Sequence, residues 1–128
     1  MPELLRLGFA VDVVALDTLD LAHENLKCTV ADAMDDAWLE KQITGTKYDV
    51  ILDFMSYTLP QFKKRAGLLL DNTDQYIYLS SCRVYANEEV PVKETSPRLL
   101  DVSKDADYLK LYEREYSLFK AAEEDVLT

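Results

Sequence analysis

Short apolar stretches alternate along this chain with segments whose apolar residues recur every three to four positions. The short stretches are rich in branched and aromatic residues and mostly apolar on both faces, as buried parallel strands are. This alternation indicates an α/β domain with a parallel sheet. Strands are predicted at residues 11–16, 27–30, 48–53 and 75–80.

Apolar residues at helical spacing predict helices between and after these strands. The first helix is expected to end at Gly8, because glycine readily ends helices. Residues 83–105 contain two prolines, many charges and little periodicity, so a long surface loop is predicted there. The helices are predicted at residues 2–7, 35–43, 59–70 and 106–127.

Length and composition fit one globular domain of 128 residues, 48% of them apolar. No apolar run approaches the roughly 20 residues that span a bilayer, and no secretory signal is visible, so we expect a cytoplasmic protein. Cys28 and Cys82 are then expected to be packing or incidental thiols, and no metal site is predicted. A net charge of −10 disfavours binding to nucleic acids and to anionic membranes.

A pair of serines ends the last predicted strand, at Ser80 and Ser81. Ligands of open α/β sheets bind outside the carboxyl ends of the strands, where these hydroxyls could hydrogen-bond a substrate oxygen. The alternative is structural, since serines also cap strands and begin turns.

Tyr116 and Lys120 are four residues apart in the last predicted helix, which puts the phenol and the ammonium on one helical face. An adjacent ammonium stabilises phenolate and lowers the pKa of tyrosine, which makes a usable proton shuttle. The alternative is coincidence, because tyrosine and lysine are both common in this chain.

Taken in order, these features resemble the extended short-chain dehydrogenases/reductases of the NAD-dependent epimerase/dehydratase type. In that family a strand ends in Ser-Ser-x-x-Val-Tyr, a loop with Pro-x-x-Glu follows, and a helix carries Tyr-x-x-x-Lys-x-x-x-Glu. The matching segments here are Ser80-Ser81-Cys82-Arg83-Val84-Tyr85, Pro91-Val92-Lys93-Glu94 and Tyr116-Ser-Leu-Phe-Lys120-Ala-Ala-Glu123.

The resemblance extends upstream to residues that would contact the cofactor. It implies that Asp17, after the first predicted strand, meets the adenosine ribose, and that Ala31-Asp32 lies at the adenine ring. Phe54 follows the third predicted strand, where the family lines its dinucleotide cleft. The alternative for Asp17 and Asp32 is that they cap helices or turns.

The family's glycine-rich phosphate loop has no counterpart in this sequence, because Gly8, Gly45 and Gly67 are isolated. The resemblance therefore implies a Rossmann-like doubly wound parallel sheet that lacks its first strand, its glycine-rich loop and the substrate domain. In the family's strand order 3-2-1-4-5 the missing strand is central. We expect strands 11–16 and 48–53 to pair directly in one four-stranded sheet, or copies of the chain to associate through the gap.

By resemblance, the chain is expected to be an NAD(P)-dependent epimerase, dehydratase or reductase acting on a nucleotide-sugar or a similar small molecule. Tyr116 would move the substrate proton, Lys120 would lower the pKa of Tyr116 and hold the nicotinamide ribose, and Ser81 would orient the reacting oxygen. Ser81 is chosen over Ser80 for its distance before Tyr85. Asp17 would repel a 2′-phosphate, which favours NAD over NADP, with cofactor binding weak or absent in this chain alone. The alternative is a non-catalytic remnant that serves protein contacts.

Overall fold

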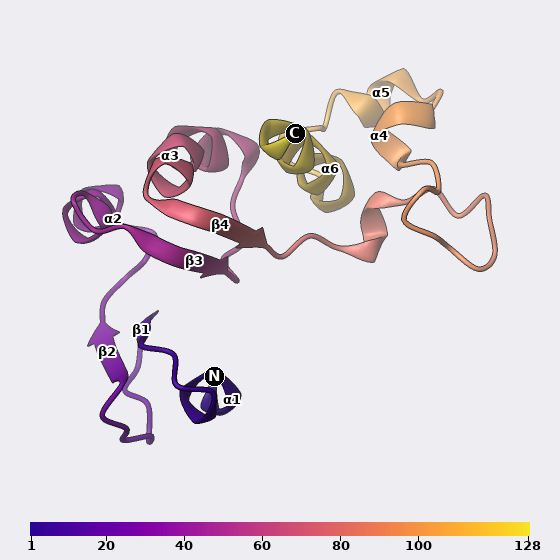
Figure 1. Ribbon diagram of the computed structural model, residues 1–128. Coiled ribbons are helices and arrows are strands. Elements are labelled where there is room, and N and C mark those ends of the chain that lie inside the picture. Colours follow the sequence, from indigo (N-terminus) through magenta and orange to yellow (C-terminus); the bar gives the residue numbers. More distant parts are fainter. The chain divides into compact units, whose positions relative to one another are not determined.

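The computed structural model describes all 128 residues, and it divides the chain into two compact units, Met1–Thr44 and Gly45–Thr128. Both units combine helices with a pair of parallel strands (Figure 1). The α/β class predicted from the apolar pattern is therefore confirmed. None of the helices combines the length and the apolar character that crossing a membrane requires.

The first unit contains two short helices and two strands. Gly8 has a φ of +88°, a conformation open to glycine, and it directly follows the last turn of the first helix as predicted. The two strands pair in parallel, with Val11 opposite Leu26. The Asp35 carboxylate accepts hydrogen bonds from two backbone N–H groups and so caps the second helix. The elements are α1 Pro2–Arg6, β1 Val11–Ala15, β2 Leu26–Val30 and α2 Asp36–Ile43.

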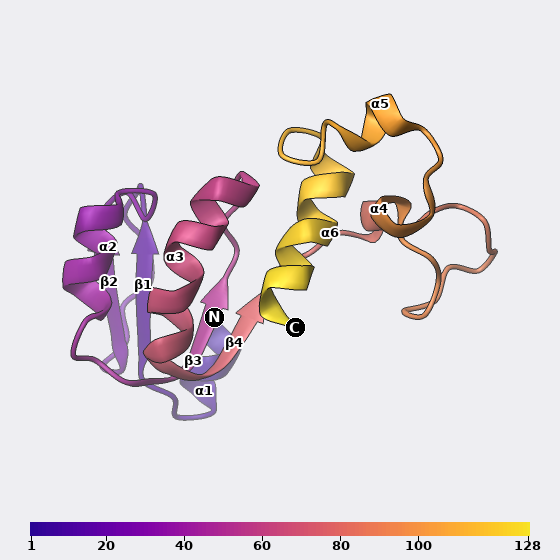
Figure 2. The ribbon, with the colours of Figure 1, turned by 90° about the horizontal axis from the view of Figure 1, so that it is seen from above.

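The second unit contains the other parallel pair, a 3-10 turn and four helices. Strands β3 and β4 pair with Ile51 opposite Tyr76 and Asp53 opposite Tyr78. Helix α3 packs on this sheet, and α6 packs against α3 and next to the end of β4 (Figures 1 and 2). The elements are β3 Tyr48–Asp53, α3 Leu59–Asp71, β4 Thr73–Tyr78, η1 Cys82–Val84, α4 Leu99–Val102, α5 Ala106–Leu109 and α6 Tyr116–Leu127.

Local sequence explains where α3 begins and which face it buries. Thr58 and Gln61 form a capping box at its first turn, and Pro60 stands in that turn, where its missing N–H costs nothing. The apolar residues then recur at helical spacing and form one buried stripe. The stripe consists of Leu59, Phe62, Ala66 and Leu69.

The β3–β4 sheet is covered on one face only. Val50, Leu52 and Ile77 point to the other face and are 41%, 43% and 43% exposed. The prediction that the strands are buried on both faces is therefore wrong for this sheet. Apolar runs of this length predict strands well, but they do not specify which face another element covers.

The two strand pairs form two separate sheets, β1–β2 and β3–β4. The predicted direct pairing of strands 11–16 and 48–53 in one four-stranded sheet is therefore wrong. Parallel strands are joined by crossover connections and not by tight turns, so a strand's sequence does not specify which edge it pairs. Association of copies through an unpaired edge stays a prediction.

The segment after β4 is more structured than the sequence predicted. Residues 83–105 are not one continuous loop, because they include most of η1 and all of α4. The single helix predicted at residues 106–127 is also wrong, since turns separate α5 from α6. The Tyr108 hydroxyl of α5 lies 2.9 Å from the hydroxyl of Ser117 in the first turn of α6, a contact that requires the chain to bend between them.

Both cysteines are exposed free thiols, Cys28 in β2 and Cys82 in η1. Neither packs in a core, so of the two roles expected for them only the incidental one fits. No disulfide constrains either unit.

Candidate functional site

Ser81 lies where the chain leaves β4 and begins η1. Its hydroxyl oxygen accepts the backbone N–H of Arg83 at 3.3 Å and so caps the 3-10 turn. Ser81 thus begins a turn, which is the structural role given as the alternative for the serine pair. The Ser81 hydroxyl makes no other hydrogen bond, so its proton can still be donated to a ligand.

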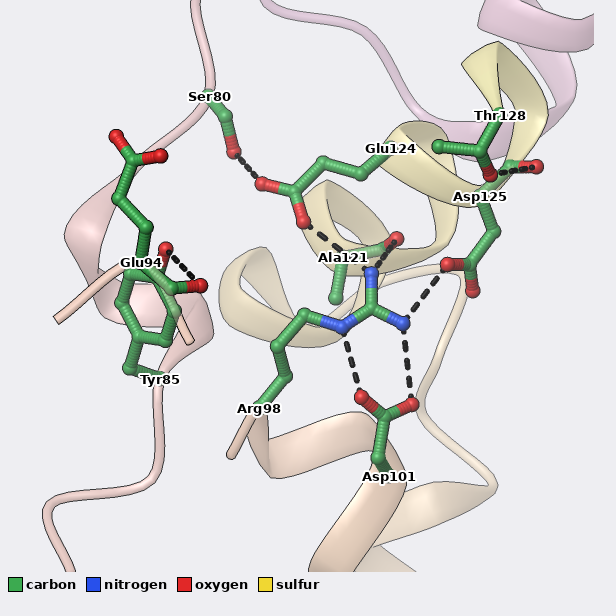
Figure 3. A network of polar contacts seen from close by, with 9 residues as sticks. All are labelled: Ser80, Tyr85, Glu94, Arg98, Asp101, Ala121, Glu124, Asp125 and Thr128. Atoms are coloured by element: carbon green, nitrogen blue, oxygen red, sulfur yellow. Dashed lines mark hydrogen bonds and ion pairs between the residues drawn. The ribbon is translucent and has the colours of Figure 1, made fainter. Parts of the chain in front are cut away.

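Ser80 is bound within the protein. Its hydroxyl donates to the Glu124 carboxylate of α6, and that carboxylate also accepts from the Arg98 guanidinium at 3.2 Å (Figure 3). Of the two serines, Ser81 is therefore the one whose hydroxyl proton is not donated within the protein.

Lys120 is almost fully buried, and its ammonium reaches the end of β4. It donates to the Tyr78 hydroxyl at 2.5 Å and to the Leu79 carbonyl at 3.3 Å, and it lies 4.4 Å from the centroid of the Tyr78 ring. The Glu123 carboxylate, one turn along α6, is 3.4 Å from the same ammonium. These contacts attach α6 to the carboxyl end of β4.

Glu123 is completely buried beside Lys120. One of its carboxylate oxygens accepts the Tyr78 hydroxyl, while the other has no hydrogen-bond partner. Burial raises the pKa of Glu123, and the hydrogen bond from Tyr78 and the charge of Lys120 partly offset this rise. Burial and the neighbouring Glu123 carboxylate raise the pKa of Tyr78 far above its ordinary value, so Tyr78 stays protonated and acts as a hydrogen-bond donor.

Tyr116 is the first residue of α6, and its ring packs edge-on against Phe119 with centroids 5.4 Å apart. The Arg83 guanidinium of η1 lies 5.4 Å from the centroid of the same ring. No hydrogen bond joins the Tyr116 hydroxyl to Ser81 or Lys120. The structure thus brings Ser81, Tyr116 and Lys120 to one η1–β4–α6 region, but the Lys120 ammonium is held by Tyr78 and not by Tyr116.

The three residues expected at the cofactor are distributed over both units. In Met1–Thr44, Asp17 is exposed after β1 with no ion pair or hydrogen bond on its carboxylate, whereas Asp32 accepts the Met34 N–H at 2.8 Å and closes a turn after β2. The capping alternative therefore describes the contact that Asp32 makes. In the second unit, Phe54 follows β3 and its side chain is 71% exposed.

Arg98 is a central residue of this region that sequence reasoning missed. Its guanidinium forms a two-point contact with Asp101 at 2.8 and 3.1 Å, meets Asp125 at 2.8 Å, and donates to the Ala121 carbonyl at 3.1 Å (Figure 3). With the bond to Glu124, it joins the start of α4 to α6. The hydrogen bonds that Arg98 donates to these carboxylates, Asp101 foremost, raise the pKa of Arg98 further above its ordinary value.

Glu124, and not Glu123, completes a Tyr-x-x-x-Lys-x-x-x-Glu pattern, because three residues separate it from Lys120; the segment ending at Glu123 was one residue short. No spacing rule connects Arg98 to α6, since their contact is purely tertiary.

Replacing Arg98 with glutamine is expected to lower the free energy of unfolding by about 1–3 kcal/mol, because charge-assisted hydrogen bonds are lost and three carboxylates remain together. Urea titration followed by near-UV circular dichroism measures the loss. Arg114→Gln is the matched control, because Arg114 is exposed and forms no ion pair. Equal unfolding midpoints for the two variants would contradict this assignment.

Asp53 is a second buried carboxylate that the sequence did not single out as a polar centre. It accepts the hydroxyls of Tyr57 at 2.8 Å and Tyr76 at 2.6 Å, and the backbone N–H of Met55 at 2.9 Å. Burial and this shared carboxylate raise the pKa values of both tyrosines. With three donors already bound, Asp53 serves the structure of the sheet and not proton transfer.

No group of three or more histidine, cysteine, aspartate or glutamate side chains is arranged to hold a metal ion. Comparison of this chain with protein-family models, with curated proteins and with solved structures found no match.

Proposed function

We propose that this chain forms part of the nucleotide-binding region of an NAD(P)-dependent epimerase, dehydratase or reductase. The observation that carries the proposal is the docking of α6 on the end of β4. Lys120 donates to the Leu79 carbonyl, and Arg83 of η1 lies over the Tyr116 ring. The helix with the tyrosine and the lysine is thereby attached to the segment that presents Ser81, outside the carboxyl end of a parallel strand, where such folds bind ligands.

The strand pairing also supports a Rossmann-like sheet. In the order 3-2-1-4-5 the second strand pairs with the third, and the fourth pairs with the fifth. The parallel pairs β1–β2 and β3–β4 are consistent with those two pairings.

In the proposed reaction each residue has a distinct role. The Tyr116 hydroxyl transfers the proton of the substrate hydroxyl, and the Ser81 hydroxyl donates a hydrogen bond to the reacting oxygen. The ammonium of Lys120 would hold the nicotinamide ribose, for which it must leave Tyr78 and Glu123. The nicotinamide ring, when bound, supplies hydride transfer to or from a substrate such as a nucleotide-sugar.

The residues present fit a dinucleotide only in part. The exposed Asp17 carboxylate is suited to ribose hydroxyls and repels a 2′-phosphate, which favours NAD. Asp32 and Phe54 are the further candidates for the adenine side and for the cleft. Gly8 and Gly45 follow helix ends, with φ values of +88° and +83°, and neither belongs to a phosphate loop. Binding by these residues alone is therefore expected to be weak.

Saturation-transfer NMR tests the proposal directly. We expect transfer from the protein to NAD⁺ with a dissociation constant of about 1 mM or weaker, and less transfer to NADP⁺. Asp17→Asn should reduce the preference for NAD⁺, whereas Asp20→Asn, a nearby exposed carboxylate without contacts, should leave it unchanged. Absence of transfer to NAD⁺ at about 5 mM would contradict cofactor binding by these residues.

A second candidate is a non-catalytic module that serves protein contacts. The apolar face of the β3–β4 sheet favours it, because Phe54 and Leu79 extend the exposed group formed by Val50, Leu52 and Ile77. The internal engagement of Ser80 and Lys120 also agrees with it. Under this alternative, neither dinucleotide receives saturation transfer.

A further inference from the structure

Arg83 is an exposed arginine in the proposed site whose guanidinium forms no ion pair and no hydrogen bond within the protein. It lies over the face of Tyr116, a cation–π contact at 5.4 Å from the ring centroid. No carboxylate is within ion-pair distance, and none of its five guanidinium N–H groups is hydrogen-bonded within the chain. Stacking on an aromatic face leaves the edges of the planar group, and the donors on them, available to a ligand.

Three other arginines of the chain, Arg6, Arg65 and Arg98, are engaged, whereas Arg114 is exposed without an ion pair and lies over no ring. Arg6 pairs with Glu3, and Arg98 pairs with three carboxylates. Arg65 is 3% exposed and lies 4.8 Å from the centroid of the Tyr57 ring. The chain has 24 acidic and 14 basic residues, so carboxylates outnumber cationic groups. Arg83 nevertheless forms no ion pair with any of them.

Glu115 is a nearby acid that feels the charge of Arg83. Its carboxylate accepts the Ser117 hydroxyl at 2.8 Å and the Tyr108 hydroxyl at 3.4 Å. The hydrogen bond from Ser117 lowers the pKa of Glu115, with a small contribution from Arg83. The Glu115 carboxylate therefore binds hydroxyls of α5 and α6. It forms no ion pair with Arg83, whose guanidinium stays available to another anion.

We propose that Arg83 is the specificity-determining residue of this site and selects an anionic substrate, binding its phosphate or carboxylate group beside Tyr116 and Ser81. The inference rests on the proposed function and adds the class of substrate. The backbone N–H of Arg83 bonds to the Ser81 hydroxyl, so one short turn carries both the anion-binding group and the group that orients the reacting oxygen. A planar guanidinium matches the two oxygens of a carboxylate or phosphate.

The test is an NMR titration of the whole chain with inorganic phosphate and, separately, with acetate at low ionic strength. Saturable shifts of the Arg83 Nε–H signal and of the Ser81 to Val84 amides are expected with at least one of the two anions. The anion that binds more tightly shows whether the site favours a phosphate or a carboxylate group. Arg83→Gln should weaken anion binding by about tenfold. Arg83→Lys should weaken it by less, because lysine keeps the positive charge but cannot contact two oxygens of the anion as a planar guanidinium does. Arg114→Gln is the matched control and should bind as the unaltered chain does.

Three results would overturn the inference. Equal binding to Arg83→Gln and to the unaltered chain, or shifts spread evenly over the arginines and lysines, would show non-specific attraction only. Displacement of phosphate by NAD⁺ would assign Arg83 to the cofactor and not to the substrate. If no anion binds at Arg83 but saturation transfer to NAD⁺ is observed, the anion site is wrong and the proposed dinucleotide site is retained. The two proposals can therefore be contradicted separately.

Discussion

Replacing Lys120 with methionine is expected to lower the free energy of unfolding of the second unit by about 3–5 kcal/mol. Methionine keeps most of the apolar stem of lysine but removes the ammonium. Glu123, which is 0% exposed and already has one oxygen without a partner, then stays buried without its cation. The Tyr78 hydroxyl and the Leu79 carbonyl lose their donor as well.

The double variant Lys120→Met, Glu123→Leu is the control for this cause. Replacing both members of a buried ion pair by apolar residues is often neutral or stabilising, so most of the loss should be recovered. Urea unfolding followed by tyrosine near-UV circular dichroism reports on the second unit, because all eight tyrosines lie within it, whereas Trp38 fluorescence reports on the first. A single variant as stable as the unaltered chain would show that Glu123 does not depend on Lys120.

The stability lost in Lys120→Met should depend on pH in a defined direction. The pKa of Glu123 is raised in the folded state, chiefly by burial, so its protonated form favours folding. That contribution is present below the ordinary pKa of about 4.3 and is lost as the pH rises through the folded value. Removing Lys120 raises the folded pKa further. The deficit of Lys120→Met relative to the unaltered chain should therefore grow between about pH 4 and pH 7.

Replacing Phe62 with alanine is expected to cost about 3–5 kcal/mol of unfolding free energy, through lost burial and a cavity. Phe62 is 0% exposed and joins α3 to the sheet. Its ring centroid lies 5.7 Å from that of Tyr57 and 5.2 Å from that of Tyr78. The same urea titration measures the loss, which should appear in the tyrosine signal.

Phe54→Ala is the matched control, because the same side chain is removed from a position that is 71% exposed. Its effect is expected within about 0.5 kcal/mol of zero, as for most surface substitutions. A large loss at Phe54 would instead indicate that another element or another copy of the chain covers the apolar face of the β3–β4 sheet.

Local features of this protein were predictable from the sequence because local interactions produce them. The four strands were predicted to within two residues at each end, since branched and aromatic runs favour extended backbone. Gly8, Asp35 and the Thr58–Gln61 pair mark helix ends through contacts with neighbouring backbone groups. The break between α5 and α6 escaped prediction, because Tyr108 reaches Ser117 only once the chain has folded back.

The sequence, through its resemblance to a family pattern, led to the expectation that Ser81, Tyr116 and Lys120 lie in one region but not to their contacts. All three lie where η1 and the end of β4 meet α6; their roles in a site stay a prediction. Helical spacing placed Lys120 on the face of Tyr116. It did not reveal that a buried glutamate and the phenol of Tyr78 would take the ammonium.

The sequence by itself determined the α/β class, the strands, most of the helix ends and the segments from which a site can be assembled. These follow from side-chain period, capping and turn chemistry, which act over a few residues. Only the tertiary structure decided that the strands form two separate pairs, that one face of the β3–β4 sheet stays exposed, and which partners Lys120, Arg98 and Arg83 have. Those outcomes depend on desolvation and charge pairing between residues far apart in the chain, which no local pattern encodes.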